Sequence, residues 1–144
     1  MVGLLVTGHG HFATGLGSSL KLITGVTENV ALVDFEEDHT IEILADNLNK
    51  ALDSLKDCDG VLVLSDLAGG SPFKTAVECK FSRPDQAIEV IAGSSLPMLI
   101  EGGMMMSAFD SPLDMAGSLI QTGQESIVRF ELEEHQDDAE EDGI

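Results

Sequence analysis

The hydrophobic residues of this chain form short, nearly continuous apolar runs that alternate with segments of helical spacing. Continuous runs rich in Val, Leu and Ile are typical of strands that are buried on both faces of a parallel sheet. Four such runs occupy residues 3–8, 29–35, 60–66 and 87–93. A fifth segment, SIVRFEL at residues 126–132, alternates apolar and polar residues, which predicts an edge strand.

Helices are predicted between these strands. The clearest spans residues 40–55, where Asp38 or Thr40 can provide the N-cap. Its apolar stripe, spaced for one helix face, consists of Ile41, Leu44, Ala45, Leu48 and Leu52. Further helices are predicted at residues 11–24, 74–81, 97–108 and 111–123.

Strands that alternate with helices through short loops imply a mainly parallel sheet with helices on both faces. We expect a doubly wound α/β fold of strand order 2-1-3-4, which suits a short chain. The switch point of such a sheet lies between its first and third strands, and ligands bind there at the carboxyl ends of the strands. His9 follows the first strand and Asp66 ends the third. The two polar residues should therefore meet in one crevice.

Length and composition favour a single domain. The 144 residues are 43% hydrophobic, enough for one packed core, which we place at residues 1–132. No apolar run approaches the roughly 20 residues that cross a bilayer. The N-terminus lacks the basic region and cleavage site of a signal peptide, so we expect a cytoplasmic protein.

The chain is strongly acidic, with a formal net charge of −19, and eight of its 26 acidic residues lie in the last fourteen positions. Residues 133–144 are therefore expected to form an acidic, disordered tail. Such a surface repels phosphate backbones and anionic lipids, which argues against binding to nucleic acid or membrane.

The pairing of His9 with Asp66 has a chemical meaning. A carboxylate that accepts the N–H of a neutral imidazole fixes the tautomer and makes the other ring nitrogen more basic. His9 would then be an oriented nucleophile or general base, and the sequence alone does not decide between them.

The segment after Asp66, LAGGSPF, favours an anion site. Gly69 and Gly70 allow close approach of the backbone, Ser71 supplies a hydroxyl, and a helix start offers free N–H groups. With Gly10, these residues are the candidate phosphoryl-binding positions. The chain has neither a P-loop motif nor a G-x-S-x-G motif. A nucleophilic nitrogen beside an anion site suits a phosphoryl group bound to histidine.

Other interpretations remain open. His9 could be a turn residue, and Asp66 could be a helix N-cap. The His-x-His spacing of His9 and His11 is also a metal-ligand pattern, and with Asp66 it would suit a metal-dependent hydrolase. Against that interpretation, His11 is expected to begin the following helix. We therefore expect no metal or other cofactor and assign His11 no catalytic role.

Three segments together resemble the IIA component of mannose-family sugar phosphotransferase systems of bacteria. They are GHGHFA after the first strand, VLVLSDLAGGSPF around the third, and EVIAGSSLPML around the fourth. The resemblance extends from Met1 to about Leu132. It departs from the family pattern at Gly8, where Thr is frequent, and at Ser95, where Asn is frequent.

The resemblance implies a phosphotransferase with a phosphohistidine intermediate. His9 would accept a phosphoryl group on Nε2 from the histidine-containing phosphocarrier protein and pass it to a IIB component. That component would phosphorylate sugar entering through the membrane components IIC and IID. Asp66 would orient His9, and Ser71 would contact the phosphoryl group.

The resemblance also implies a free-standing IIA component that forms a homodimer, in which segment 126–132 is exchanged as an antiparallel edge strand. Two alternatives use the same chemistry. The chain could be a regulatory sensor read through its phosphohistidine, or the corresponding subunit of a dihydroxyacetone phosphotransfer system.

Overall fold

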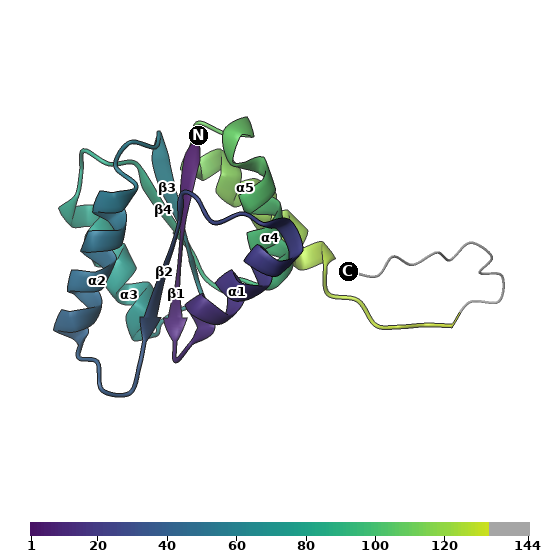
Figure 1. Cartoon of the computed structure of the whole chain (residues 1–144), viewed down its shortest axis with the longest axis horizontal. Coiled ribbons are helices and arrows are strands. Elements are labelled where there is room, and N and C mark those ends of the chain that lie inside the picture. The colour runs from purple at the N-terminus through teal and green to yellow at the C-terminus, as the bar shows by residue number, and fades with distance from the viewer. Residues whose placement is uncertain (133–144) are drawn as a thin grey trace.

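A computed structural model describes residues 1–132 of the chain. The predicted acidic tail, residues 133–144, lies outside the described residues. Four parallel strands form one sheet of order β2-β1-β3-β4, which confirms the predicted fold class and strand order (Figure 1). The strands are β1 (Val2–His9), β2 (Val30–Phe35), β3 (Gly60–Ser65) and β4 (Ile88–Ile91).

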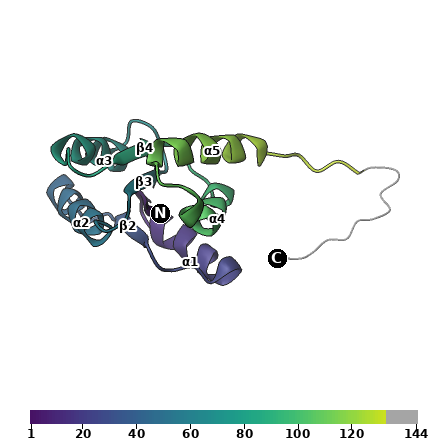
Figure 2. The same cartoon turned by 90° about the horizontal axis from the view of Figure 1, so that it is seen from above.

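Helices cover both faces of the sheet (Figure 2). One face is covered by α1 (Phe12–Thr24), α4 (Leu96–Met105) and α5 (Pro112–Glu125), with a short 3-10 helix, η1 (Met106–Ala108), after α4. The other face is covered by α2 (Ile41–Ser54) and α3 (Ser71–Ser82). Among residues 1–132, no helix combines the length and the apolar character that crossing a membrane requires.

The apolar runs divide their side chains between two cores because successive strand residues point to opposite faces. On β1, Leu4 and Val6 pack with the helices of the α1 side, whereas Leu5 packs with those of the α2 side. All three are fully buried. Because β1 is buried on both faces, its sequence is one continuous apolar run.

Several boundaries differ from the prediction. Helix α3 begins at Ser71, three residues early, because Pro72 fits a first helical turn, where its missing N–H is not needed. Strand β4 ends at Ile91, and Gly93 takes a positive φ of 74° in the following turn. The predicted cap of α2 is confirmed at Thr40, whose hydroxyl accepts the N–H of Ile43 at 3.1 Å.

Segment 126–132 does not pair with a strand of its own chain in the described structure. Helix α5 continues to Glu125, and the segment then extends away from the body (Figure 1). Its apolar side chains, Ile127, Val128, Phe130 and Leu132, are each more than 80% exposed. The exchange of this segment between two copies remains a prediction.

Candidate functional site

His9 lies at the carboxyl end of the sheet, as the topology predicts. It is the last residue of β1 and pairs in register with Phe35 at the end of β2. Its side chain is 45% exposed, whereas Val2 to Gly8 are buried. Gly10 then turns the chain with a positive φ of 61°, which glycine adopts without steric cost. The imidazole of His9 therefore lies at the surface, at the end of the buried strand.

Asp66 directly follows β3 and holds His9 through two contacts. Its Oδ2 lies 2.8 Å from Nδ1 of the ring and accepts the backbone N–H of His9 at 2.9 Å. The other oxygen, Oδ1, accepts the N–H of Leu67 at 2.8 Å. The predicted meeting of the two residues is confirmed.

These hydrogen bonds keep Asp66 ionised. Burial alone would raise the pKa of its carboxyl, but the N–H bonds from His9 and Leu67 outweigh that effect, and the pKa is lowered overall. Because an ionised carboxylate only accepts hydrogen bonds, Nδ1 of His9 must be the protonated ring nitrogen. In the neutral ring, Nε2 then has the lone pair.

Gly70 and Phe35 both lie against the His9 ring. A Cβ added at Gly70 would lie 2.7 Å from Cε1 and 3.3 Å from Nε2, so only glycine permits this approach. The ring of Phe35 meets His9 edge to face, with centroids 6.1 Å apart. The space beside Nε2 is therefore bounded by the Gly70 backbone.

The residue before His9 is glycine for a reason that the structure makes clear. A Cβ at Gly8 would lie 2.6 Å from the ring of Phe12 and 2.9 Å from Cγ of Asp66. Glycine at this position therefore makes room for Phe12 and for the carboxylate.

The loop after Asp66 supplies backbone donors to the same edge. Gly69 has a φ of 88°, which favours glycine, and Gly70 is the extended N-cap residue of α3. Ser71 is the first residue of that helix and is half-buried. Because the first N–H groups of a helix lack helical partners, this start can bind an anion without a basic side chain.

His11 is not part of this arrangement. Its Nδ1 lies 3.2 Å from Oδ2 of Asp34, on β2. The structure therefore does not bring His9, His11 and Asp66 together as one set of metal ligands. The sequence analysis did not predict the contact between His11 and Asp34. The sequence feature that could have indicated it is the pair of acidic residues Asp34 and Glu36, two positions apart at the end of β2.

The fold and the site define a class: an α/β protein with a carboxylate-paired histidine exposed at the switch point of a parallel sheet. Residues 3–116 match the family model EIIA-man, described as "PTS system fructose IIA component". The matched region contains His9, Asp66 and the loop between Asp66 and α3.

Individual proteins agree with this match. The chain is 32% identical to the mannose-specific EIIAB component of Escherichia coli (strain K12) over 88% of its own length and 38% of that protein. It is 33% identical to the fructose-specific EIIA component of Bacillus subtilis (strain 168), over 70% of this chain and 68% of that one. The chain thus spans well under half the length of the E. coli relative.

A solved structure shows the same architecture. The mannose/sorbose specific IIA subunit of Enterococcus faecalis superimposes with a TM-score of 0.81 at 27% identity, covering 93% of this chain and 98% of that one. The chain belongs to the mannose-type family of IIA components of sugar phosphotransferase systems.

Proposed function

We propose that this chain is a cytoplasmic phosphoryl carrier that serves sugar uptake. Nε2 of His9 accepts a phosphoryl group from the histidine-containing phosphocarrier protein and passes it to a IIB component, which works with IIC and IID in the membrane. The observation that supports this most strongly is the 2.8 Å contact between Nδ1 of His9 and Asp66, which leaves Nε2 as the unpaired nitrogen of a side chain that is 45% exposed.

The chemistry follows from the protonation states. The Nε2 lone pair attacks phosphorus, a new N–P bond forms, and the P–N bond to the donor histidine breaks with its electron pair returning to the donor ring. The His9 ring becomes positively charged, and the Asp66 carboxylate stabilises that charge through Nδ1–H. In this proposal, backbone N–H groups at Gly70 and Ser71, together with the Ser71 hydroxyl, contact the phosphoryl oxygens. Attack by the acceptor protein then reverses these events.

Labelling with phosphorylated phosphocarrier protein tests this proposal. The chain should gain one phosphoryl group that is labile in acid and stable in base, and His9→Ala should abolish the gain. His39→Gln is the matched control, because His39 accepts the N–H of Glu36 and does not contact the His9–Asp66 pair. Labelling that survives His9→Ala would refute the assignment.

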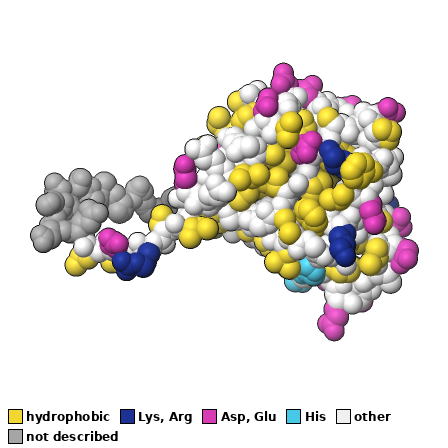
Figure 3. Space-filling view, turned by 180° about the vertical axis from the view of Figure 1, so that it is seen from behind, with side chains coloured by type: hydrophobic (Ala, Val, Ile, Leu, Met, Phe, Trp, Pro, Cys, Tyr) yellow, Lys and Arg dark blue, Asp and Glu magenta, His cyan; other side chains and the backbone are white. Residues whose placement is uncertain are grey.

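We further propose that the chain forms a homodimer in which segment 126–132 adds to β4 of a second copy. Strand β4 is an edge of the sheet and has no neighbour on its outer side among the described strands. Figure 3 shows apolar side chains both on the protruding segment and on the body beside it. A segment that is apolar, extended and unpaired is suited to strand addition.

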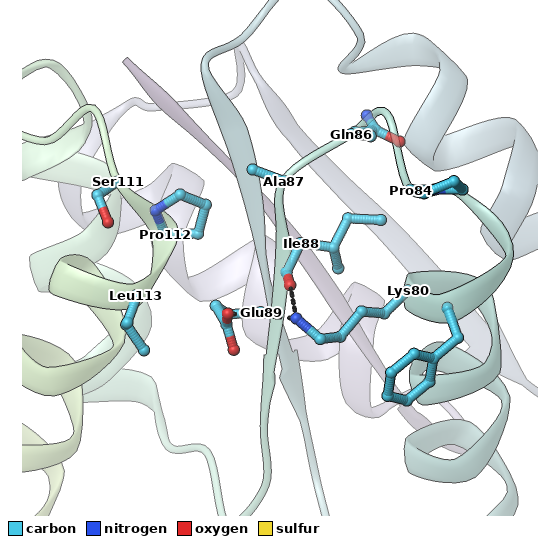
Figure 4. A pocket seen from close by; sticks show the side chains of 10 residues that line it. Lys80, Pro84, Gln86, Ala87, Ile88, Glu89, Ser111, Pro112 and Leu113 are labelled. Carbon is cyan, nitrogen blue, oxygen red and sulfur yellow. Dashed lines mark hydrogen bonds and ion pairs between the residues drawn. The ribbon is translucent and has the colours of Figure 1, made fainter.

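A groove of about 460 Å³ runs along β4 between α3 and α5 (Figure 4). Leu113 of α5 lies on one side of it, and Lys80 of α3 reaches from the other side to the Ile88 carbonyl at 2.6 Å. The groove offers apolar surface next to the free strand edge, which supports the proposed docking of the second copy.

Light scattering of the purified chain tests the dimer. Phe130→Asp should produce a monomer, because it places a charge in the interface. Leu22→Asp on α1 is the control, since Leu22 is similarly exposed, at 87% against 81% for Phe130. A dimer that is unaffected by Phe130→Asp would contradict the proposed exchange.

A further inference from the structure

Three potential metal ligands lie together beside the His9 site but separate from it. We call them the HDE cluster: His11 at the N-cap of α1, Asp34 on β2, and Glu36 directly after β2. One donor atom from each residue lies within 4.8 Å of the others. Nδ1 of His11 is 3.2 Å from Oδ2 of Asp34, and Nε2 is 3.9 Å from Oε1 of Glu36.

Asp34 is the fixed member of the cluster. Its Oδ1 accepts the backbone N–H of Thr14 at 3.0 Å, and its Oδ2 accepts the Thr14 hydroxyl at 2.7 Å. Its side chain is only 9% exposed. A carboxylate has about four lone-pair sites, so both oxygens retain capacity for a further ligand bond. The fold thus holds one acidic ligand rigidly at the end of β2.

The other two members are free to adjust. An ion binds only one nitrogen of an imidazole ring, so the 3.2 Å and 3.9 Å contacts, made by different nitrogens of His11, cannot both be ligand spacings. The side chains of His11 and Glu36 are 72% and 43% exposed, so rotation about their side-chain bonds can bring three donor atoms that lie within 4.8 Å of one another to ligand spacing. Neighbouring ligands of tetrahedral zinc are roughly 3.3–3.6 Å apart, as follows from metal–ligand bonds of about 2.0–2.2 Å. The 3.2 Å between His11 and Asp34 is already close to this spacing.

We propose that the HDE cluster binds one divalent transition-metal ion, with Zn²⁺ the best fit. Imidazole nitrogen favours Zn²⁺ and its first-row neighbours over Ca²⁺ and Mg²⁺, which prefer oxygen ligands alone. Two carboxylates neutralise the charge of the ion, and water completes the coordination. The net charge of −19 attracts cations to the chain.

The other two histidines among the described residues, His39 and His9, make different hydrogen bonds. Nδ1 of His39 accepts the backbone N–H of Glu36 at 2.9 Å, so the proton of its neutral ring is on Nε2 and that nitrogen cannot coordinate. Nδ1 of His9 is paired with Asp66, and among the described residues His9 does not lie in a group of three potential metal ligands. His9 therefore provides the matched control for His11, because His39 contacts the backbone of Glu36.

A bound ion would connect the start of α1 to the end of β2 across the Gly10 turn. The site begins two residues after His9, so the ion would also place positive charge near the surface where an anionic phosphoryl group is expected. Binding itself does not depend on the proposed carrier function, and His9→Ala should leave it intact.

Calorimetric titration of the full, untagged chain with ZnCl₂ tests the proposal. One ion should bind per chain, and His11→Ala should lower the association constant at least tenfold, with Glu36→Gln acting in the same direction. His9→Ala should bind as the wild type does. Because His135 and its acidic neighbours are also potential ligands in the sequence, His135→Gln is included and should have no effect.

Thermal unfolding provides an independent readout. Saturating Zn²⁺ should raise the Tm of the wild type and of His135→Gln by the same amount, and that of His11→Ala by clearly less. Equal affinity in wild type and His11→Ala, or loss of binding in His135→Gln alone, would overturn the proposal.

Discussion

Asp66→Asn tests the role of the carboxylate beside His9 more sharply than removal of the side chain, because it preserves shape and changes charge. In the wild type the two carboxylate oxygens accept three N–H groups: the ring and backbone N–H of His9 and the backbone N–H of Leu67. An asparagine has one oxygen, so either orientation of the amide sets its NH₂ against an N–H group. With the NH₂ toward His9, the ring must accept at Nδ1, and Nε2 then carries the proton and has no lone pair to attack phosphorus.

The magnitude follows from the lost interaction. A hydrogen bond to a charged group contributes about 1.5–3 kcal/mol, and the Asp66 side chain is only 13% exposed, so solvent screens little of it. If the carboxylate acts mainly on the charged transition state, the transfer rate should fall by roughly 10- to 150-fold. Complete loss of activity is not expected, because one amide orientation keeps Nδ1–H bonded.

Rapid-quench measurement of phosphoryl transfer from the phosphorylated phosphocarrier protein provides the assay. Asp46→Asn on α2 is the control, since it removes one exposed carboxylate with the same chemical change. A rate for Asp66→Asn within twofold of the wild type, with an unchanged Tm, would refute the reasoning. An equal loss in both variants would indicate a general charge effect instead.

Three further predictions concern the same fold and site. Hydrogen bonds lower the pKa of Asp66 in the folded state below its ordinary value of 3.8. Its stabilising contribution is therefore present at neutral pH and is lost as the pH falls through the lowered pKa. In urea unfolding, the difference in free energy of unfolding between wild type and Asp66→Asn should be smaller at about pH 3 than at pH 6. Gly70→Ala should slow phosphoryl transfer at least tenfold, because its Cβ would contact the His9 ring at 2.7 Å, whereas Gly117→Ala on α5 meets nothing within 4 Å and should leave transfer unchanged. Leu4→Ala, at a fully buried position in the core, should lower the free energy of unfolding by about 2–5 kcal/mol in a urea titration.

The strand order and the central contact of the site could be predicted from the sequence. Apolar runs that stop at His9 and Asp66 locate both residues at strand ends, and a doubly wound sheet gathers the ends of β1 and β3. The structure was needed for the distances between His9 and Asp66 and for the inference that Nδ1 of His9 carries a proton.

Other features could not be predicted because they depend on contacts between distant residues. His11 turns toward Asp34 through the positive φ of Gly10, a conformation that the letters HGH do not specify. The clash that excludes a side chain at Gly8 involves the ring of Phe12 and the carboxylate of Asp66, which is 58 positions away. The partner proposed for segment 126–132 is a second copy, so the described chain alone does not test it.

The most direct test of the central proposal is to locate the phosphorus on the labelled chain by ³¹P NMR of the intact protein, with peptide mapping to identify the residue. The account predicts one phosphoryl group on Nε2 of His9, because Nδ1 is bonded to Asp66. Phosphorus on Nδ1 of His9, or on any other histidine, would contradict it.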